Sequence, residues 1–285
     1  MKPKLPPRRA GPGDSEIEPC SVLRCQVAAP TELRNDLLAR EEPLEIRVRG
    51  RCFAVTMRTP GHDEELAAGF LLGEGIVRNR GDIIEIGPHR SAEGAGAENL
   101  LNVFLAPSVE VDFEKLARHV YASSSCGLCG KVSIESVHQH FAPLKSAFTL
   151  PTQILIGLPT KLRTAQSTFG LTGGSHAAAI FDERGELVVL REDVGRHNAV
   201  DKALGHGFLN EFLPFQRHVL LVSGRSSFEI VQKALAARIP IVAAVSAPSS
   251  LAVAFAKESG LTLAGFLREG SFNLYSHPER IIENG

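Results

Sequence analysis

The sequence predicts a mixed α/β protein whose second half is built around a parallel sheet. Three apolar segments, VLLVSG, PIVAAVSA and LTLAGFL, alternate with two helical ones, SFEIVQKALAARI and PSSLAVAFAKESG. Strand, helix, strand alternation with almost uninterrupted apolar strands is typical of a parallel sheet covered by helices on both faces. The length of 285 residues is near the limit of about 250 to 300 residues for one core, so we expect two lobes.

The first half is expected to hold a tail and an α+β lobe. Residues 1–19 contain five prolines and few large apolar side chains, so they should be a disordered tail. In the lobe, residues 20–147, EIRVRGRCFAVTMRT alternates around Arg49-Gly50, which predicts a hairpin. ELAAGFLLGEGI then has apolar residues at helical spacing. IIEIG, NLLNVFLAP and VDFEKLARHV follow, and the lobe ends in a C-x-x-C loop and a helix.

The second lobe, residues 148–285, is expected to begin with a helix at about 152–168, although Gly157 and Pro159 are unfavourable in its first turns. HAAAIFDERGELVVLRED predicts two strands joined by a turn at residues 182–185. GRHNAVDKALG predicts a helix entered through a glycine turn. The alternating strands and helices of the parallel sheet come next.

Composition and charge exclude several classes of function. The chain has 31 Lys and Arg against 32 Asp and Glu, so its net charge provides no overall electrostatic attraction to nucleic acid. Its longest apolar stretch, residues 239–247, is far shorter than the roughly 18 residues of a membrane span. No apolar stretch follows Arg8-Arg9, which argues against a secretory or twin-arginine signal, and we expect a cytoplasmic protein. Five cysteines are too few to stabilise a chain of this length through disulfide bonds.

The sharpest chemical motif is SSSCGLCGK, residues 123–131, which places Cys126 and Cys129 in a loop rich in serine and glycine. KVSIESVHQH after it predicts a helix. A helix N-terminus and the ammonium of Lys131 both favour a thiolate, which is the nucleophilic form of cysteine. Two thiols at this spacing can also exchange sulfur, one accepting a group that the other resolves. The alternative is a pair of buried, inert cysteines.

Metal binding and redox chemistry are the rival interpretations of this pair. C-x-x-C is half of many zinc sites, and Cys20, Cys25, His138 and His140 could supply further ligands, but at no standard spacing. A thioredoxin-like dithiol fits less well, because the pair does not follow an early strand of a βαβ unit. His62-Asp63-Glu64 matches half of the zinc deaminase signature, but Ser125 stands where that signature has proline. A solvated helix start explains these three residues better.

Glycine turns and strand ends predict a site for an anionic ligand. TGGSH precedes one strand, and REDVGRHN, with Arg196, joins a strand to a helix that carries Lys202. Free backbone amides and cationic side chains at such joints bind phosphate, although a capped turn also explains the glycines and Asp193. Three segments that follow the apolar strands, 223–227, 246–250 and 266–271, would converge on one crevice if the strands are adjacent. The sequence contains neither a dinucleotide fingerprint nor a P-loop.

Together these motifs identify a resemblance. TPGHDEELAAGFLLGEGI, SSSCGLCGK, TGGSHAAAIF, REDVGRHNAVDKALG, SGRSSFEIVQKA and FLREGSFNLYSHPERI occur in the same order in the FdhD family of formate dehydrogenase accessory sulfurtransferases, which the chain resembles from about residue 40 to its C-terminus. The resemblance implies that the second domain is a three-layer, cytidine-deaminase-like α/β domain without deaminase activity. It also implies a homodimer.

The resemblance further implies a function and its residues. Such a protein accepts persulfide sulfur from a cysteine desulfurase and passes it to the molybdenum cofactor, bis(molybdopterin guanine dinucleotide), which then enters formate dehydrogenase. Cys126 matches the cysteine that bears the persulfide, and Cys129 matches its partner. The segment assigned to cofactor binding corresponds to Phe266, Leu267, Arg268, Glu269, Gly270 and Ser271. No permanently bound metal is expected; the alternative is a zinc-binding, non-catalytic chaperone for the cofactor.

Overall fold

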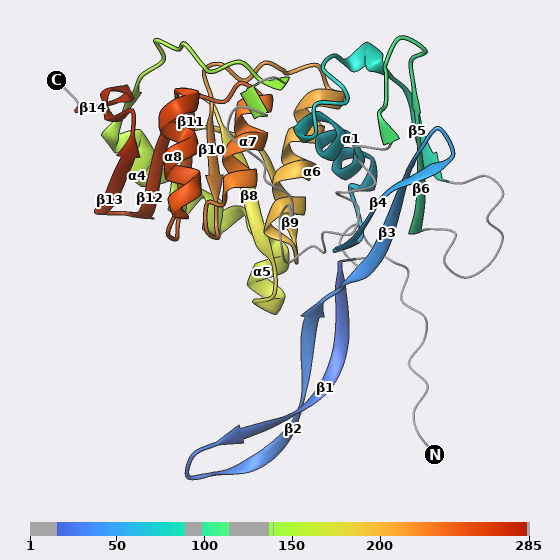
Figure 1. Cartoon of the computed structure of the whole chain (residues 1–285). Coiled ribbons are helices and arrows are strands. Elements are labelled where there is room, and N and C mark those ends of the chain that lie inside the picture. The colour runs from blue at the N-terminus through green and yellow to red at the C-terminus, as the bar shows by residue number, and fades with distance from the viewer. Residues whose placement is uncertain (1–15, 89–98, 114–136, 139, 284–285) are drawn as a thin grey trace.

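A computed structural model describes residues 16–88, 99–113, 137–138 and 140–283 of the chain. Figure 1 shows a larger sheet with helices around it, a smaller sheet beside it, and a two-stranded arm that projects from the body. The mixed α/β class predicted from the sequence is confirmed. No helix among the described residues is long and apolar enough to cross a bilayer.

The smaller sheet has the strand order β4-β3-β6-β5. Its elements are β3 (Glu42–Val48), β4 (Arg51–Arg58), α1 (Asp63–Gly73), the 3-10 helix η1 (Arg80–Asp82), β5 (Ile83–Pro88) and β6 (Leu100–Leu105). The predicted hairpin forms because Arg49 and Gly50 both have positive φ, 51° and 76°, as a two-residue turn that follows the twist of its strands requires. The predicted helix is α1.

The larger sheet has the order β13-β12-β11-β10-β8-β9. Its strands are β8 (His176–Phe181), β9 (Leu187–Asp193), β10 (Val219–Val222), β11 (Ile241–Ala244), β12 (Thr262–Arg268) and β13 (Ser271–Ser276). As predicted, β10, β11 and β12 are parallel. The sheet as a whole is mixed, because the strands outside this set run antiparallel to their neighbours. Short turns join β8 to β9 and β12 to β13, and such turns permit only antiparallel pairing.

Helices cover both faces of this sheet. They are α4 (Thr152–Ala165) on one face and α6 (Arg196–Leu209), α7 (Phe228–Ala236) and α8 (Ser250–Ser259) on the other. The short helix α5 (Ser167–Thr172) follows α4. In β8, Ala178 and Ile180 belong to one buried cluster with α6, α7 and α8, whereas Ala179 and Phe181 belong to a second cluster with α4. Because alternate side chains of a strand point to opposite faces, this assignment defines the three expected layers.

The helix expected at about 152–168 is two helices. Gln166 has extended backbone angles, φ −76° and ψ 95°, which separate α4 from α5. Pro159 lies inside α4 without ending it. The short strand β7 (Leu150–Pro151), which precedes α4, pairs in parallel with β14 (Ile281–Ile282) near the C-terminus. The 3-10 helix η3 (Pro278–Arg280) precedes β14.

The two sheets share one continuous core, which includes β3, β6 and α1 from the first and β8, β10 and α6 from the second. Helices α1 and α6 cross at two glycines. A Cβ on Gly69 would lie 1.8 Å from the carbonyl oxygen of Asp201, and one on Gly205 would lie 1.8 Å from that of Glu65. Only glycine permits so close an approach of two backbones. The lobes are therefore joined along a helix pair.

The arm is a hairpin of β1 (Ile17–Gln26) and β2 (Ala29–Ala39), for which the sequence analysis offers no prediction. Figure 1 shows it extending from the base of β3 away from both sheets. β1 begins at Ile17, so it overlaps by three residues the tail expected at residues 1–19. The first fifteen residues of that tail lie outside the described residues.

Candidate ligand pocket

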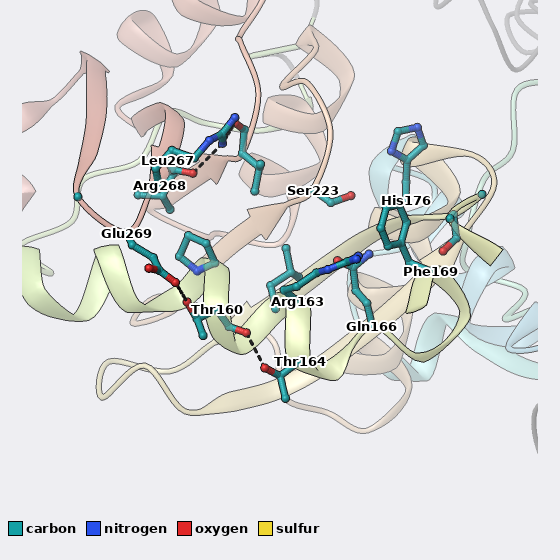
Figure 2. A pocket seen from close by; sticks show the side chains of 17 residues that line it. Thr160, Arg163, Thr164, Gln166, Phe169, His176, Ser223, Leu267, Arg268 and Glu269 are labelled. Atoms are coloured by element: carbon teal, nitrogen blue, oxygen red, sulfur yellow. Dashed lines mark hydrogen bonds between the residues drawn. The ribbon is translucent and has the colours of Figure 1, made fainter. Parts of the chain in front are cut away.

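A pocket of about 970 Å³ lies at the edge of the larger sheet where β10, β11 and β12 end (Figure 2). One residue from each strand end lines it: Ser223 after β10, Val245 after β11 and Leu267 in β12. The sequence predicts that residues 223–227, 246–250 and 266–271 converge on one crevice, and the strand ends do meet because the three strands are adjacent and parallel. The lining agrees only in part with this prediction: Ser223 and residues 267–270 line the pocket, whereas no residue of 246–250 does. The wall opposite the strand ends comes from α4 and α5.

The turn after β12 supplies four of the six residues of the predicted cofactor segment. Leu267, Arg268, Glu269 and Gly270 line the pocket, whereas Phe266 and Ser271 do not. One Nη of Arg268 donates hydrogen bonds to the backbone carbonyls of Val245 and Leu267. These bonds hold the guanidinium at the strand ends without neutralising its charge.

The α4 wall faces this turn. Oγ1 of Thr160 donates a hydrogen bond of 2.6 Å to Oε1 of Glu269, which ties the turn to the helix. The guanidinium of Arg163 lies 4.2 Å from the ring centroid of Phe169. Figure 2 shows these groups around one hollow. Among the described residues, neither Arg163 nor Arg268 forms an ion pair with a carboxylate, so both cations remain available to an anionic ligand.

A glycine turn and the start of β8 form the third wall. Gly173 ends α5 with φ 65°, and Gly174, Ser175 and His176 follow it into the strand. The carboxylate of Glu192 accepts hydrogen bonds from the amides of Thr168 and Phe169, both of 2.8 Å, and from Oγ of Ser175. Glu192 therefore occupies the N-terminus of α5, and an anionic ligand must use the side chains and the glycine turn instead.

The surroundings of His176 favour its neutral ring over the protonated one. Burial lowers its pKa, and the charges of Arg196, His197 and Arg225 lower it further. The ring fits because residue 224 is glycine: a Cβ there would lie 3.2 Å from Nδ1 of His176. A neutral imidazole beside cationic groups can donate one hydrogen bond and accept another.

The REDVGRHN segment has a structural role at its centre. Nζ of Lys202 lies 2.7 Å from Oδ2 of Asp193, and the two side chains are 1% and 0% exposed. Lys202 also donates to the carbonyl oxygen of Thr59, whose amide donates to Asp193. The expectation that Lys202 could bind phosphate is therefore wrong, because its ammonium joins the two lobes and does not reach solvent.

A second hydrogen-bonded group, which the sequence analysis missed, lies at the start of α6 and α7. Nε2 of His197 is 2.8 Å from Oγ of Ser227, which donates a 2.7 Å hydrogen bond to Oε2 of Glu229. The hydrogen bond with His197 lowers the pKa of Glu229 to about 2, against the opposing effect of burial. No local pattern marks this group, because its members come from two segments thirty residues apart.

Cys126 and Cys129 lie outside the described residues. Phe113 is the last described residue before them, and the guanidinium of Arg51 lies 5.2 Å from the centroid of its ring. After them, the described chain resumes at residues 137–138, where Nε2 of His138 is 2.9 Å from Oγ of Ser259 in α8. The ends of the segment that carries both cysteines are thus held against the body.

The residues considered as metal ligands are dispersed among the described elements. Cys20 and Cys25 are on the arm, whereas His138 packs on α8, a different part of the molecule (Figure 1). Nδ1 of His62 lies 3.3 Å from Oε2 of Glu65. Within the described ranges, no group of three or more His, Cys, Asp or Glu residues is placed to hold a metal ion.

The fold and pocket define a class: a three-layer α/β protein with a pocket, lined by two arginine side chains, at the carboxyl edge of its parallel strands. The profile of the FdhD/NarQ family matches residues 39–282. The chain belongs to this family.

Individual proteins show the same relationship. The chain is 52% identical over 266 residues to "Sulfur carrier protein FdhD" of Streptomyces coelicolor, covering 91% of this chain and 94% of the relative. It is 50% identical over 255 residues to the protein of that name in Mycobacterium tuberculosis, covering 87% and 92%. A crystal structure from Desulfotalea psychrophila, provisionally described as a formate dehydrogenase accessory protein, has a TM-score of 0.72 at 27% identity, covering 93% of this chain and 98% of that one.

Proposed function

We propose that this protein is a sulfur carrier that takes sulfur from a cysteine desulfurase and passes it to the bis(molybdopterin guanine dinucleotide) molybdenum cofactor before the cofactor enters formate dehydrogenase. The names of its relatives support the sulfur-carrying role. The observation that carries the cofactor assignment is the pocket that Leu267, Arg268, Glu269 and Gly270 line. The resemblance assigns cofactor binding to the same segment.

The first transfer needs only a thiolate on this chain. The thiolate of Cys126 attacks the outer sulfur of the persulfide on the desulfurase. The sulfur–sulfur bond of the donor breaks, the donor cysteine leaves as a thiolate, and Cys126 becomes a persulfide. No electron is gained or lost overall. Lys131 and the start of the predicted helix after it would favour the thiolate form.

The second transfer delivers the outer sulfur to the cofactor. Cys129 offers one route: its thiolate attacks the inner sulfur of the Cys126 persulfide, a Cys126–Cys129 disulfide forms, and hydrosulfide leaves toward the acceptor. A reductant of the thiol class must then restore both thiols. The cytoplasm supplies such reductants, and we place the protein there.

The pocket has the chemistry for the nucleotide end of the cargo. Two guanidiniums, from Arg163 and Arg268, suit a pyrophosphate. The ring of Phe169 and the plane of Arg163 offer surfaces for stacking a purine. The volume of about 970 Å³ is within the range of roughly 300 to 1,000 Å³ of small-molecule sites. The residues present therefore fit a purine nucleotide, the class to which the guanine nucleotide of the cargo belongs.

The sulfur step is tested by intact mass measurement after incubation with a cysteine desulfurase and sulfur-labelled cysteine. The native chain should gain labelled sulfur that reductant removes. Cys126→Ala should gain none, and Cys129→Ala should still gain it, because one thiol suffices for a persulfide. Labelling of Cys126→Ala to the native level would refute the assignment, and zinc on an unlabelled native chain would indicate a metal-binding chaperone instead.

The cargo step is tested separately by titrating the chain with GDP in a calorimeter. Arg268→Met should raise the dissociation constant about tenfold or more, as expected for the loss of a charge-assisted hydrogen bond. Arg184→Met is the matched control, because Arg184 lies in the β8–β9 turn and does not line the pocket. Equal affinities for GDP in all three proteins would place the nucleotide elsewhere.

A further inference from the structure

The alternation of side chains along β12, the last strand of the parallel set, is interrupted once. Leu263 belongs to the buried cluster with α6, α7 and α8, whereas Ala264 belongs to the cluster with α4. Because alternate side chains of a strand point to opposite faces, residue 266 should follow Ala264 onto the α4 side. Instead, Leu267 is the next member of the cluster with α4, and Phe266 is 44% exposed.

The backbone of Phe266 produces this interruption. Its φ is 53°, in the left-handed region, and the register between β12 and β13 shifts between Gly265 and Arg268. A left-handed residue inside a strand makes a bulge, which moves the next side chain to the face that it would otherwise avoid. The amide of Phe266 donates a hydrogen bond of 3.1 Å to the carbonyl oxygen of Ser246, which fixes the bend to the end of β11.

Neither the hairpin turn nor burial of the ring explains a phenylalanine in this conformation. The chain reverses only later, between the paired residues Arg268 and Ser271. The left-handed region is unfavourable for a bulky L residue and is usually occupied by glycine or asparagine. The ring of Phe266 is nearly half exposed, so its burial offsets little of this strain. Strain that persists in a fold indicates a functional constraint.

The bend determines which side chains line the pocket. Leu267, Arg268 and Glu269 line it, whereas Phe266 does not (Figure 2). Without the bend, strict alternation would put the ring of Phe266 on the pocket side and carry Leu267 to the opposite face. With the bend, Nη1 of Arg268 donates to the carbonyl oxygen of Val245 at the pocket wall.

We propose that Phe266 is a positioning residue that shapes the pocket through its backbone and not through contact of its ring with the ligand. Its left-handed conformation presents the side chains of residues 267–269 to the ligand. The inference rests on the proposed function for the identity of that ligand, a purine nucleotide. The geometric part can be measured without any ligand.

Calorimetric titration with GDP compares two substitutions at this position. Phe266→Gly removes the ring and leaves the left-handed region accessible, so the dissociation constant should stay within about twofold of the native one. Phe266→Val disfavours that region, because a β-branched side chain is rarely accommodated there. A bend that persists in only about a tenth of the molecules raises the apparent dissociation constant about tenfold, and we expect at least this increase.

Glu211→Val is the matched control. Glu211 also has a positive φ, 60°, but it follows α6 and does not line the pocket. The substitution should lower the melting temperature, as Phe266→Val does, and leave the dissociation constant for GDP unchanged. The comparison therefore separates a change of the pocket from a general loss of stability.

A crystal structure of Phe266→Val without nucleotide is the second measurement. Residue 266 should have a negative φ, and Leu267 should no longer line the pocket. A valine that keeps φ near 53° with Leu267 in place, or an affinity for GDP equal to the native one, would overturn the proposal.

Two other outcomes are also decisive. A loss of affinity in Phe266→Gly as large as that in Phe266→Val would overturn the proposal and assign a direct contact to the ring. A native chain that binds no GDP would refute the nucleotide assignment of the proposed function, and the crystal structure would still decide the role of the bend.

Discussion

The buried pair of Lys202 and Asp193 offers a quantitative test of how the two lobes are joined. Replacing Lys202 by Met removes the ammonium and keeps most of the side-chain volume. The carboxylate of Asp193, which is fully buried, then loses its cation. It keeps hydrogen bonds from the amides of Thr59 and Gly195 and from Nδ2 of Asn198, at 3.1, 2.8 and 3.0 Å.

The magnitude follows from what each substitution leaves behind. Breaking a buried ion pair costs roughly 3 to 5 kcal/mol. Lys202→Met should be near the lower end, about 3 kcal/mol, because three donors still solvate the carboxylate. Asp193→Asn should be near the upper end, because the ammonium keeps only the carbonyl oxygen of Thr59 among the contacts described here. The double variant should cost less than the sum of the two single ones.

Urea unfolding followed by circular dichroism measures these free energies. Lys161→Met is the control, since its ion pair with Glu186 has the same length, 2.7 Å, but side chains 43% and 71% exposed. Such exposed pairs contribute about 0 to 1 kcal/mol. If Lys202→Met destabilised the protein no more than Lys161→Met, the reasoning would be refuted, and Lys202 would contribute mainly through its packed aliphatic chain.

Three further predictions concern the helix crossing, a carboxylate and the pocket. Gly205→Ala should destabilise the protein by about 3 kcal/mol or more and lower its melting temperature accordingly, because the added Cβ meets backbone rather than a movable side chain. Gly157→Ala is the control: a Cβ there has nothing within 4 Å, so the melting temperature should not fall. Because the pKa of Glu229 falls on folding from 4.5 to about 2, its stabilising effect is present above pH 4.5 and is lost as the pH falls toward 2; Glu229→Gln should therefore flatten the decline of the melting temperature in that window, and an unchanged slope would contradict this. Arg163→Leu should weaken GDP binding about tenfold with no change in melting temperature, and a loss of stability instead would show that Arg163 serves the fold.

Local patterns account for the elements that the sequence predicts correctly. The hairpin at residues 42–58 follows from alternation around Arg49-Gly50, and α1 follows from apolar residues at helical spacing. The strands β10 and β11 are apolar throughout, as strands buried on both faces must be, and β12 is apolar from Leu263 to Leu267. In each case the information lies within about fifteen consecutive residues, so no distant contact is needed to specify the element.

Local sequence patterns predict only part of the pocket lining. Leu267, Arg268, Glu269 and Gly270 follow from the resemblance, and Ser223 follows from the strand ends. Arg163 and Phe169 belong to no motif; their position depends on the break at Gln166, which turns α5 against the glycine turn. The only sequence signal for that wall is the glycine pair at residues 173 and 174, and glycine pairs are common in turns.

The sequence by itself determined the mixed α/β class, the parallel central strands, the family and the candidate cysteines, because each of these depends on residue types and spacings within a segment. Only the tertiary structure decided that Lys202 bonds to Asp193 rather than to a ligand, that α1 and α6 touch through Gly69 and Gly205, and that residues 17–39 form a two-stranded arm. These features arise between segments far apart in the chain, where burial, hydrogen-bond partners and strand register exist only after folding.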